Sequence, residues 1–577
     1  MIPGRGTMAG LLCVVICMIL LSLMSCGQAS AASDSRPLNT IAGFSPEKAL
    51  RLGEDIYRRG ILPTGEPVKA ILQDDIPVTG TMFTCVSCHM RSGLGSIEGT
   101  VITLPTSGPR LFKPLTAAEL NEGFLRAVFK DQASLSLRRP PYTDETLAIA
   151  LRHGADPSGR QLHAVMPRYL LEDRDMEILI FYLKSLSASP SPGVTETTMQ
   201  FATIITEEVS SRDRQSLLGP LEWFVRARNS RADYMRKKTS GRHLPEQMDR
   251  AFRRWSLSVW ELKGPPATWR GQLEQYYRQE PVFAVLSGIS TRDWAPIHAF
   301  TEEHGIPSIF PVTDLPVISE TDWYTLYFSK GLVQEAVAAM QFIEGLPEAS
   351  PDAPVLQVIG NDPESAVLAG AVRDYLLKQG RGGPIDLVID ADRPLSRKEA
   401  DALLAKYRSP LVLFWAGRNA PAAAAMMLQS PHKPNMIFMS STLLGDAIYT
   451  VPESIRKDVY ITWPYQLPAD IKKDAFSFMN IWGKTPGKVP VNRTIATKAY
   501  FAGSILIEAL MHLKTNFYRD YFLDVISMIS DHKIKIPVYP RLSFGPGQRY
   551  ASKGCYIVQL SAGPDPEVVR RSEWVMH

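Results

Sequence analysis

The chain has few cysteines and little net charge, and the apolar run near its N-terminus is too short to span a bilayer comfortably. Its 577 residues include six cysteines and carry a formal net charge of +4. The small charge argues against nucleic acid or a strongly anionic membrane surface as the partner. The cysteine spacing implies no disulfide framework. The sequence also lacks a Gly-x-Ser-x-Gly nucleophile elbow and a carboxylate pair placed for acid–base work, so it indicates neither of these catalytic devices.

The first residues predict an export signal. A positive charge precedes the apolar residues 11–24, which are too few for a mature membrane span. Two processing sites compete. Residues 23–26 resemble a bacterial lipobox, which would leave Cys26 as a lipidated N-terminus, and residues 29–31 would serve ordinary signal peptidase. Both alternatives predict a signal peptide within residues 1–31 and a periplasmic or extracytoplasmic protein, anchored as a lipoprotein in the first case.

The most informative stretch is residues 85–89, with the sequence CVSCH. Cys85 and Cys88 are spaced for two thioether bonds to one porphyrin, and His89 is placed to ligate its iron. The same cysteine spacing also occurs in half zinc sites and in dithiol redox pairs. A zinc site needs a second ligand pair, whereas the only later cysteine is Cys555, and a redox pair needs a preceding strand that is poorly supported here. The motif therefore predicts one covalently attached haem c.

Residues 44–187 resemble a class I cytochrome c. A serine and a proline at residues 45–46 are typical of a helix start, and apolar residues follow at helical spacing, with Gly53 allowing another helix to cross closely. Residues 173–186 repeat the helical spacing. The packing of an N-terminal on a C-terminal helix is the arrangement of these cytochromes, so the resemblance implies an all-α haem domain. An insertion within residues 57–85, rich in proline, glycine and acidic residues, departs from the family.

The resemblance also implies how the iron is ligated. Met166 matches the methionine segment of class I cytochromes, and its soft thioether favours ferrous iron and a high reduction potential. His153 and His163 are alternative ligands that would give a bis-histidine haem of lower potential, although their polar surroundings are typical of the surface. Pro109 matches the proline whose carbonyl orients the axial histidine. Its alternative role is an ordinary Gly-Pro turn.

A proline- and serine-rich stretch, predicted as a linker over residues 188–197, precedes a different pattern. Beyond it, strands alternate with helices, which predicts parallel α/β sheets covered on both faces. The expected strands lie at residues 201–205, 282–286, 307–310, 355–359, 385–389, 411–415 and 436–439.

Residues 198–563 resemble the type I periplasmic binding proteins, the family of branched-chain amino-acid receptors. The matching segments, in order, are residues 285–311, 355–376, 497–513 and 542–549. The resemblance implies two α/β lobes that close on a ligand, followed by a C-terminal tail at residues 564–577. Ligands of open α/β sheets lie beyond the carboxyl ends of the strands. The residues predicted on this rule to face the cleft are Ser287, Ser290, Thr313, Asn361 and Trp415.

Residues 226–254 depart from that family because they are rich in arginine and lysine. Such a segment is either a docking face for an acidic partner or a solvated helix face. The solvated face is the commoner of the two in proteins.

These patterns together predict an exported monohaem c-type cytochrome that transfers single electrons. A six-coordinate haem leaves no open site at the iron, which favours an electron carrier over a stand-alone enzyme. The predicted partners are a redox protein, either a dehydrogenase or a terminal acceptor, and a small-molecule ligand. Three roles of the second module stay open: it brings the carrier to a dehydrogenase or its substrate, it is a ligand-sensing or solute-binding receptor whose haem reports binding, or it is a scaffold with a vestigial cleft.

Overall fold

The structure is a computed structural model that describes residues 40–73, 75–98, 101–116, 138–239, 253–346, 353–390, 395–407, 411–471, 492–529, 536–544 and 548–576. The predicted signal peptide, including Cys26, lies outside these residues. The chain forms two compact units. One consists of Pro140–Ser185 with the residues up to Ser87, and the other of Cys88–Arg139 with the residues from Leu186 onward. The predicted haem domain, residues 44–187, is therefore divided between the two units.

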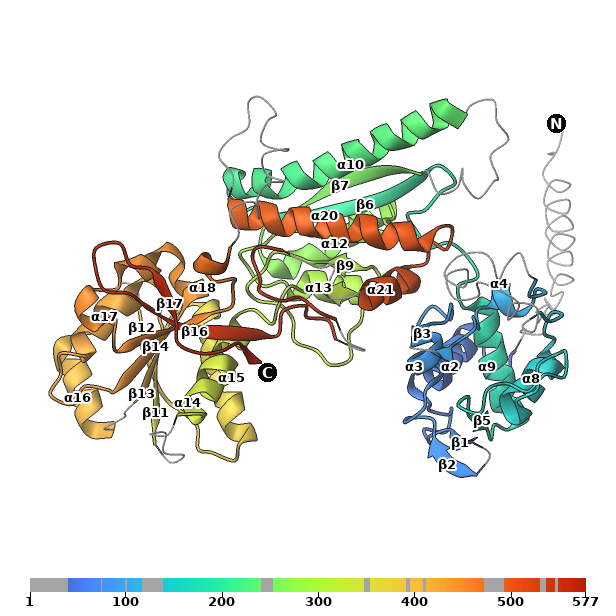
Figure 1. Ribbon diagram of the computed structural model, residues 1–577, viewed down its shortest axis with the longest axis horizontal. Helices are drawn as coiled ribbons and strands as arrows, with labels where there is room; N and C mark the ends of the chain where they lie inside the picture. The colour runs from blue at the N-terminus through green and yellow to red at the C-terminus, as the bar shows by residue number, and fades with distance from the viewer. Residues whose placement is uncertain are drawn as a thin grey trace, which may run out of the picture. The chain divides into compact units, whose positions relative to one another are not determined.

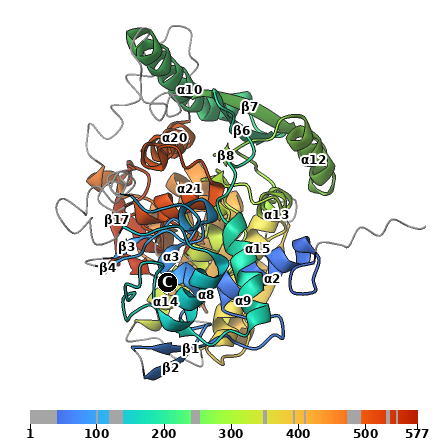
Figure 2. The same ribbon diagram turned by 90° about the vertical axis from the view of Figure 1, so that its right-hand side faces the viewer.

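Two crossing helices form the core of the first unit. α2 (Pro46–Arg59) begins after the Ser45 cap, as predicted, and α9 (Asp173–Ser185) packs across it. Gly53 lies at the crossing, where a Cβ atom would be only 2.4 Å from Cβ of Tyr182. This contact confirms the two predicted helices and the close approach that Gly53 permits. α8 (Asp144–His153) packs on α9 (Figure 2).

The first unit also contains a small antiparallel sheet, so the prediction of an all-α domain is wrong for this part of the chain. Part of the insertion forms a hairpin of β1 (Lys69–Leu72) and β2 (Ile76–Thr79). β1 also pairs with β5 (Arg168–Tyr169). The proline and glycine residues of the insertion favour turns and extended chain over helix. The outer backbone groups of β1 form hydrogen bonds with β5, which follows Met166.

The second unit contains two sheets with the same strand order. Each sheet places its first five strands, numbered along the chain, in the order second, first, third, fourth, fifth, and these strands are all parallel. This is a doubly wound α/β order, and it confirms the predicted α/β class. The first lobe has β6 (Thr198–Thr206), β7 (Arg254–Leu262), β8 (Ala284–Leu286), β9 (Ser308–Ile309) and β10 (Thr325–Leu326). The second has β11 (Val355–Gly360), β12 (Ile385–Ile389), β13 (Leu411–Trp415), β14 (Met436–Ser440) and β15 (Val459–Trp463).

The C-terminal residues extend the second sheet instead of forming a separate tail. β16 (Gly554–Leu560) pairs antiparallel with β15, and both β17 (Val568–Arg570) and β18 (Val575–Met576) pair with β16. The prediction that residues 564–577 lie outside the domain is therefore wrong, because these short strands cover an edge that would otherwise expose unpaired backbone groups.

Helices cover the sheets of both lobes (Figure 1). In the first lobe α10 and α20 pack along each other, and residues 88–139 add the short elements β3, β4 and α4 to the second unit. The bounds in the first lobe are α10 (Ser211–Thr239), α12 (Trp269–Gln279), α13 (Ala295–Glu303), α20 (Arg493–Leu513) and α21 (Arg519–Met528). In the second lobe they are α14 (Leu332–Glu344), α15 (Pro363–Lys378), α16 (Arg397–Tyr407), α17 (Ala420–Met427) and α18 (Ser441–Leu444). The short elements are β3 (Ile97–Glu98), β4 (Val101–Ile102) and α4 (Gly108–Leu111).

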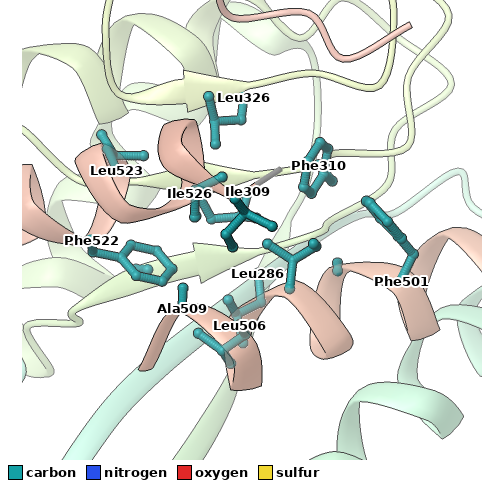
Figure 3. Packing of buried hydrophobic residues seen from close by; sticks show 14 of the residues in the cluster. Leu286, Ile309, Phe310, Leu326, Phe501, Leu506, Ala509, Phe522, Leu523 and Ile526 are labelled. Atoms are coloured by element: carbon teal, nitrogen blue, oxygen red, sulfur yellow. The ribbon is translucent and has the colours of Figure 1, made fainter. Parts of the chain in front are cut away.

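The first lobe has an extensive apolar core. Leu286 and Ile309 on the strands pack against Phe501 of α20 and Phe522 of α21 (Figure 3). Among the described helices, α20 is the one long and apolar enough to cross a membrane, but 67% of its apolar window is buried inside the protein. Its apolar surface is therefore explained by packing in this core.

The arginine- and lysine-rich segment begins inside α10. Arg226 pairs with Glu222 at 3.3 Å on the exposed face of that helix, and Arg254, at the start of β7, pairs with Asp233 at 2.5 Å. Residues 240–252 lie outside the described part of the chain. Exposed pairs of this kind are expected on a solvated helix face.

Candidate functional site

The predicted haem-attachment residues form one short helix, α3 (Cys85–His89). Cys85 is partly buried and Cys88 is exposed, and neither is in a disulfide. Side chains three residues apart lie on the same face of a helix. α3 therefore presents both sulfur atoms on one side, as attachment of a single porphyrin requires.

A backbone carbonyl orients the imidazole of His89. Its Nδ1 lies 2.9 Å from the carbonyl oxygen of Leu104, which leaves Nε2 as the nitrogen available to a metal. Burial lowers the pKa of His89 to about 4, although the bond to Leu104 acts in the opposite direction. The prediction assigned this carbonyl to Pro109, which instead lies in α4. The β3–β4 hairpin explains the difference, because it returns the chain to α3 at Leu104, before Pro109 is reached.

A small, mostly apolar pocket lies beside Cys85 in the first unit. The Tyr169 hydroxyl, at its wall, donates to the carbonyl oxygen of Phe83 at 3.2 Å, and Cys85 Sγ lies 3.9 Å from the same hydroxyl. Two sulfurs on one helix face, followed by an imidazole with one nitrogen free for a metal, fit the covalent attachment of a haem. Residues that line the pocket include Ile56, Val68, Phe83, Tyr169, Leu171 and Leu179.

Met166 lies in a loop that is held by hydrogen bonds. The guanidinium of Arg168 donates to the carbonyl oxygens of Met166 at 2.6 Å and Leu162 at 3.0 Å. Met166 N also donates to the carbonyl oxygen of His163 at 2.9 Å. His163 is exposed and His153 ends α8. The local order of this loop suits a residue that must hold a fixed position, and iron ligation by Met166 stays a prediction.

The five residues predicted to face the cleft are divided between the lobes: Ser287, Ser290 and Thr313 belong to the first, and Asn361 and Trp415 to the second. Ser287 and Trp415 are fully buried, and Trp415 donates from Nε1 to Gln357 Oε1 at 2.8 Å within the core of the second lobe. Trp415 is therefore a core residue, contrary to the prediction, because β13 is covered on both faces. Thr313 caps a turn by accepting from Leu315 N, and Asn361 is exposed before α15.

Ser290 lies near the point between β6 and β8 where the strand order of the first lobe changes direction. Its hydroxyl donates to Glu208 Oε1 at 3.3 Å, and these two residues follow β8 and β6, the neighbouring third and first strands of the lobe. Glu208 also accepts from Thr291 at 3.4 Å. The sequence analysis missed Glu208, which follows the first strand of this lobe by two residues.

Three chain segments connect the two lobes and lie side by side. Tyr327 N donates to the carbonyl oxygen of Arg549 at 2.8 Å, and Ser552 N donates to that of Phe328 at 2.7 Å. The third segment follows β15, where Gln466 N donates to the carbonyl oxygen of Val538 at 2.8 Å. Residues on these segments are placed between the lobes, next to the carboxyl end of β15.

A buried lysine lies on the first-lobe side of these segments. Lys498, on α20, is 6% exposed. Its Nζ lies 5.5 Å from the ring centroid of Phe328 and 5.6 Å from that of Tyr539, and the Tyr539 ring is 6.0 Å from the ring of Tyr465. Burial opposes the charge of Lys498, but Tyr539 and Asp314 outweigh it and raise the pKa of this lysine above its ordinary value.

A buried glutamate lies on the second-lobe side. Glu335, on α14, is fully buried and accepts a hydrogen bond from Thr462 Oγ1, at the carboxyl end of β15. The hydroxyls of Tyr465 and Thr442 lie 3.0 Å apart beside it. Burial raises the pKa of Glu335 to about 7, and the neighbouring hydroxyls act in the opposite direction. We call the following residues the interlobe cluster: Lys498, Tyr539, Tyr465, Thr442, Thr462 and Glu335.

Sequence reasoning missed the interlobe cluster, although a signal was present. Lys498 and Glu335 each stand in a helix whose buried face is otherwise made almost entirely of apolar residues and alanine. A charged residue on such a face is rarely buried without a partner or a function. Within the described part of the chain, no group of three or more histidine, cysteine or acidic side chains is placed to hold a metal ion.

Comparison with known proteins gives matches among solved structures alone. No family model matches the chain, and no curated protein matches it. A fatty acid ABC transporter substrate-binding protein from Thermomonospora curvata is 16% identical, with a TM-score of 0.41 over 67% of this chain and 94% of that one. A branched-chain amino acid ABC transporter from Thermus thermophilus with bound valine is 13% identical, with a TM-score of 0.43 over 66% and 97%. A solute-binding protein from R. palustris in complex with benzoate is 11% identical, with a TM-score of 0.43 over 66% and 96%.

Proposed function

We propose that the protein is an exported c-type cytochrome that carries one covalent haem and transfers single electrons. The observation that supports this most strongly is α3, which places Cys85 and Cys88 on one face, directly before an imidazole whose Nδ1 is bonded to Leu104. When bound, the haem supplies one-electron chemistry at iron. Cys85 and Cys88 would hold it covalently, and His89 and Met166 would be its axial ligands.

The surrounding residues have roles that suit this proposal. The hydrogen bond from His89 to Leu104 fixes the ring orientation and directs Nε2 away from the backbone. Apolar residues line the pocket beside Cys85, and apolar surroundings favour the less charged ferrous state. A methionine ligand acts in the same direction, so we expect a high reduction potential, suited to accepting electrons from a periplasmic dehydrogenase or passing them to a terminal acceptor.

A second function, that of a solute-binding receptor, is favoured by a different observation. Two lobes share one doubly wound strand order, and a buried polar cluster lies at the carboxyl end of β15 next to the segments that join them. Ligands of open α/β sheets bind at this end of the strands. We propose that the α/β module binds a small molecule outside the cytoplasm, with Cys26 as a lipid anchor if the lipobox is processed.

Expression of the full chain in a bacterium with a c-type haem maturation system tests the proposed cytochrome. We expect haem that stays attached to the denatured polypeptide, one per chain, and its loss in the Cys85→Ser/Cys88→Ser double variant. The buried Cys555→Ser variant is the matched control and should keep its haem. Wild-type protein without covalent haem would exclude the cytochrome, and a reduction potential that shifts on ligand addition would favour the receptor over a plain carrier.

A further inference from the structure

The chain segment that follows His89 is held by the first lobe of the α/β module. Ser92, three residues after His89, is fully buried, and its N–H donates to Asp524 Oδ2 on α21 at 3.0 Å. The carbonyl oxygen of Ser92 accepts from Ser187 Oγ at 2.7 Å. Residues 88–139 and α21 both belong to the second unit. Both backbone groups of Ser92 are therefore held by residues that are distant along the chain.

Short-range hydrogen bonds connect Ser92 to His89. Met90 has a φ of 63°, a left-handed conformation that is uncommon for a residue other than glycine and that ends α3. Gly93 N donates to the carbonyl oxygen of Met90 at 3.2 Å, and Gly95 N donates to that of His89 at 3.2 Å. The turn is closed by these bonds, so holding Ser92 in place restricts the backbone of His89.

A second contact joins the same segment to the first lobe. The guanidinium of Arg91 lies 4.5 Å from the ring centroid of Trp323, just before β10. Its Nε lies 3.8 Å from Asp520 Oδ1 on α21. Arg549, on one of the segments that connect the lobes, lies 3.7 Å from the centroid of the same ring. Trp323 therefore contacts both the segment that follows His89 and a segment that connects the lobes.

Packing alone does not explain the buried carboxylate of Asp524. This residue is 1% exposed. Burial raises the pKa of Asp524 to about 6, and Asp520 acts in the same direction, whereas the bonds from Ser92 and the charge of Arg91 act in the opposite direction. Desolvation of a carboxylate destabilises the folded state, and an apolar side chain of similar volume would avoid that loss. The carboxylate provides instead an acceptor for Ser92 N at a defined position.

We propose that the first lobe of the α/β module positions His89 for iron ligation. Asp524 acts by holding the backbone of Ser92. Trp323 acts by packing against Arg91. The inference rests on the proposed cytochrome function, and it gives the α/β module a role in haem ligation that does not depend on any solute. Asp524 and Trp323 are positioning residues, because they act on His89 through the turn that follows it.

Electron paramagnetic resonance of the ferric holoprotein tests this proposal, because the g-values of a low-spin haem depend on the orientation of its axial ligands. Asp524→Ala removes both the acceptor and the charge, whereas Asp524→Asn removes the charge and keeps an acceptor oxygen. We expect changed g-values in Asp524→Ala and values close to the wild type in Asp524→Asn. Loss of charge is common to the two variants, so the difference between them reports the hydrogen bond to Ser92. Wild-type g-values in Asp524→Ala, or the same change in both variants, would overturn the proposal.

Asp213→Ala is the matched control for general destabilisation of the lobe. Asp213, near the start of α10, accepts from Asn492 Nδ2 at 3.1 Å. We expect wild-type g-values in this variant, and a change as large as that in Asp524→Ala would count against a specific role of Asp524. If Asp524→Ala does not fold, Trp323→Leu takes its place, and unchanged g-values in Trp323→Leu would then refute the proposal.

Hydrogen exchange in the haem-free Cys85→Ser/Cys88→Ser background gives a second readout. Peptides within residues 86–96 should exchange about tenfold faster when Asp524→Ala is added, because a buried N–H loses its acceptor, and Asp524→Asn should recover most of the protection. Equal exchange with and without Asp524→Ala would contradict the proposed positioning.

The two proposals fail in different ways. Wild-type protein without covalent haem would overturn the proposed cytochrome and this inference with it. Wild-type protein that carries haem, with g-values that do not respond to Asp524→Ala, would keep the cytochrome and overturn the positioning role alone.

Discussion

The helix crossing at Gly53 allows a stability prediction of definite sign. A Cβ atom at this position would lie 2.4 Å from Cβ of Tyr182 and 2.8 Å from the carbonyl oxygen of Ile178. Both distances are far below van der Waals contact, so Gly53→Ala must push α2 and α9 apart. Overpacking of this kind costs about 1–3 kcal/mol, whereas alanine gains about 0.5–1 kcal/mol in helix propensity. We expect a net destabilisation of about 1–2 kcal/mol in the first unit.

Hydrogen exchange with mass spectrometry measures this change locally. Peptides from α2 and α9 should exchange about 5- to 30-fold faster in Gly53→Ala than in the wild type, if exchange reports the opening equilibrium. Gly370→Ala is the matched control, since Gly370 lies inside α15 with no atom within 4 Å of the added Cβ. That variant should be neutral or slightly stabilising. Unchanged or slower exchange of α2 in Gly53→Ala would refute the close crossing.

Three further predictions concern the proposed ligand loop and the interlobe cluster. Met166→His should keep covalent haem and lower its midpoint potential in a redox titration; an unchanged potential would remove Met166 from the iron. Arg168→Gln removes the two hydrogen bonds from the guanidinium to the Met166 loop. The red absorption band of methionine-ligated ferric haem should therefore weaken, and Arg168→Lys should recover part of it. A band of full strength in Arg168→Gln would show that these bonds do not position the ligand. The pKa of Glu335 is raised from 4.5 to about 7, so the folded state binds the proton more tightly and stability falls as pH rises through this window. Glu335→Gln should remove this fall in the free energy of unfolding, which amounts to about 3 kcal/mol at most. Denaturant titrations at pH 4 and pH 8 measure the change. Parallel pH profiles of variant and wild type would contradict the prediction.

Local signals identified the two crossing helices of the first unit and seven strands of the α/β module, because the forces that form these elements act over a few residues. Ser45 and Pro46 mark the start of α2, and the same two features start it in the structure. β7 and β15 were missed, although the residues of β7 alternate between polar and apolar over much of its length. The strands that pair with β7 and β15 cannot be identified from the local sequence.

Residues placed by long-range packing were harder to predict. Trp415 is the last residue of an apolar strand, which suggested a position at the cleft, yet its indole donates a hydrogen bond to Gln357 on the neighbouring strand β11. The carbonyl that orients His89 belongs to Leu104 instead of Pro109, because a two-strand hairpin decides which part of the chain returns to α3. In both cases the hydrogen-bond partner is brought close by the fold and cannot be identified from the local sequence.

The sequence by itself determined the spacing of Cys85, Cys88 and His89, from which haem attachment is predicted, since these residues lie within five positions and their spacing needs no other element. It also determined the α/β class of the second half through the alternation of strands and helices. Only the tertiary structure brought Lys498 and Glu335, more than a hundred residues apart in the sequence, to opposite sides of one buried cluster. The order of the strands and the paths of the chain between the lobes decide which distant residues come together, and no local sequence pattern encodes either feature.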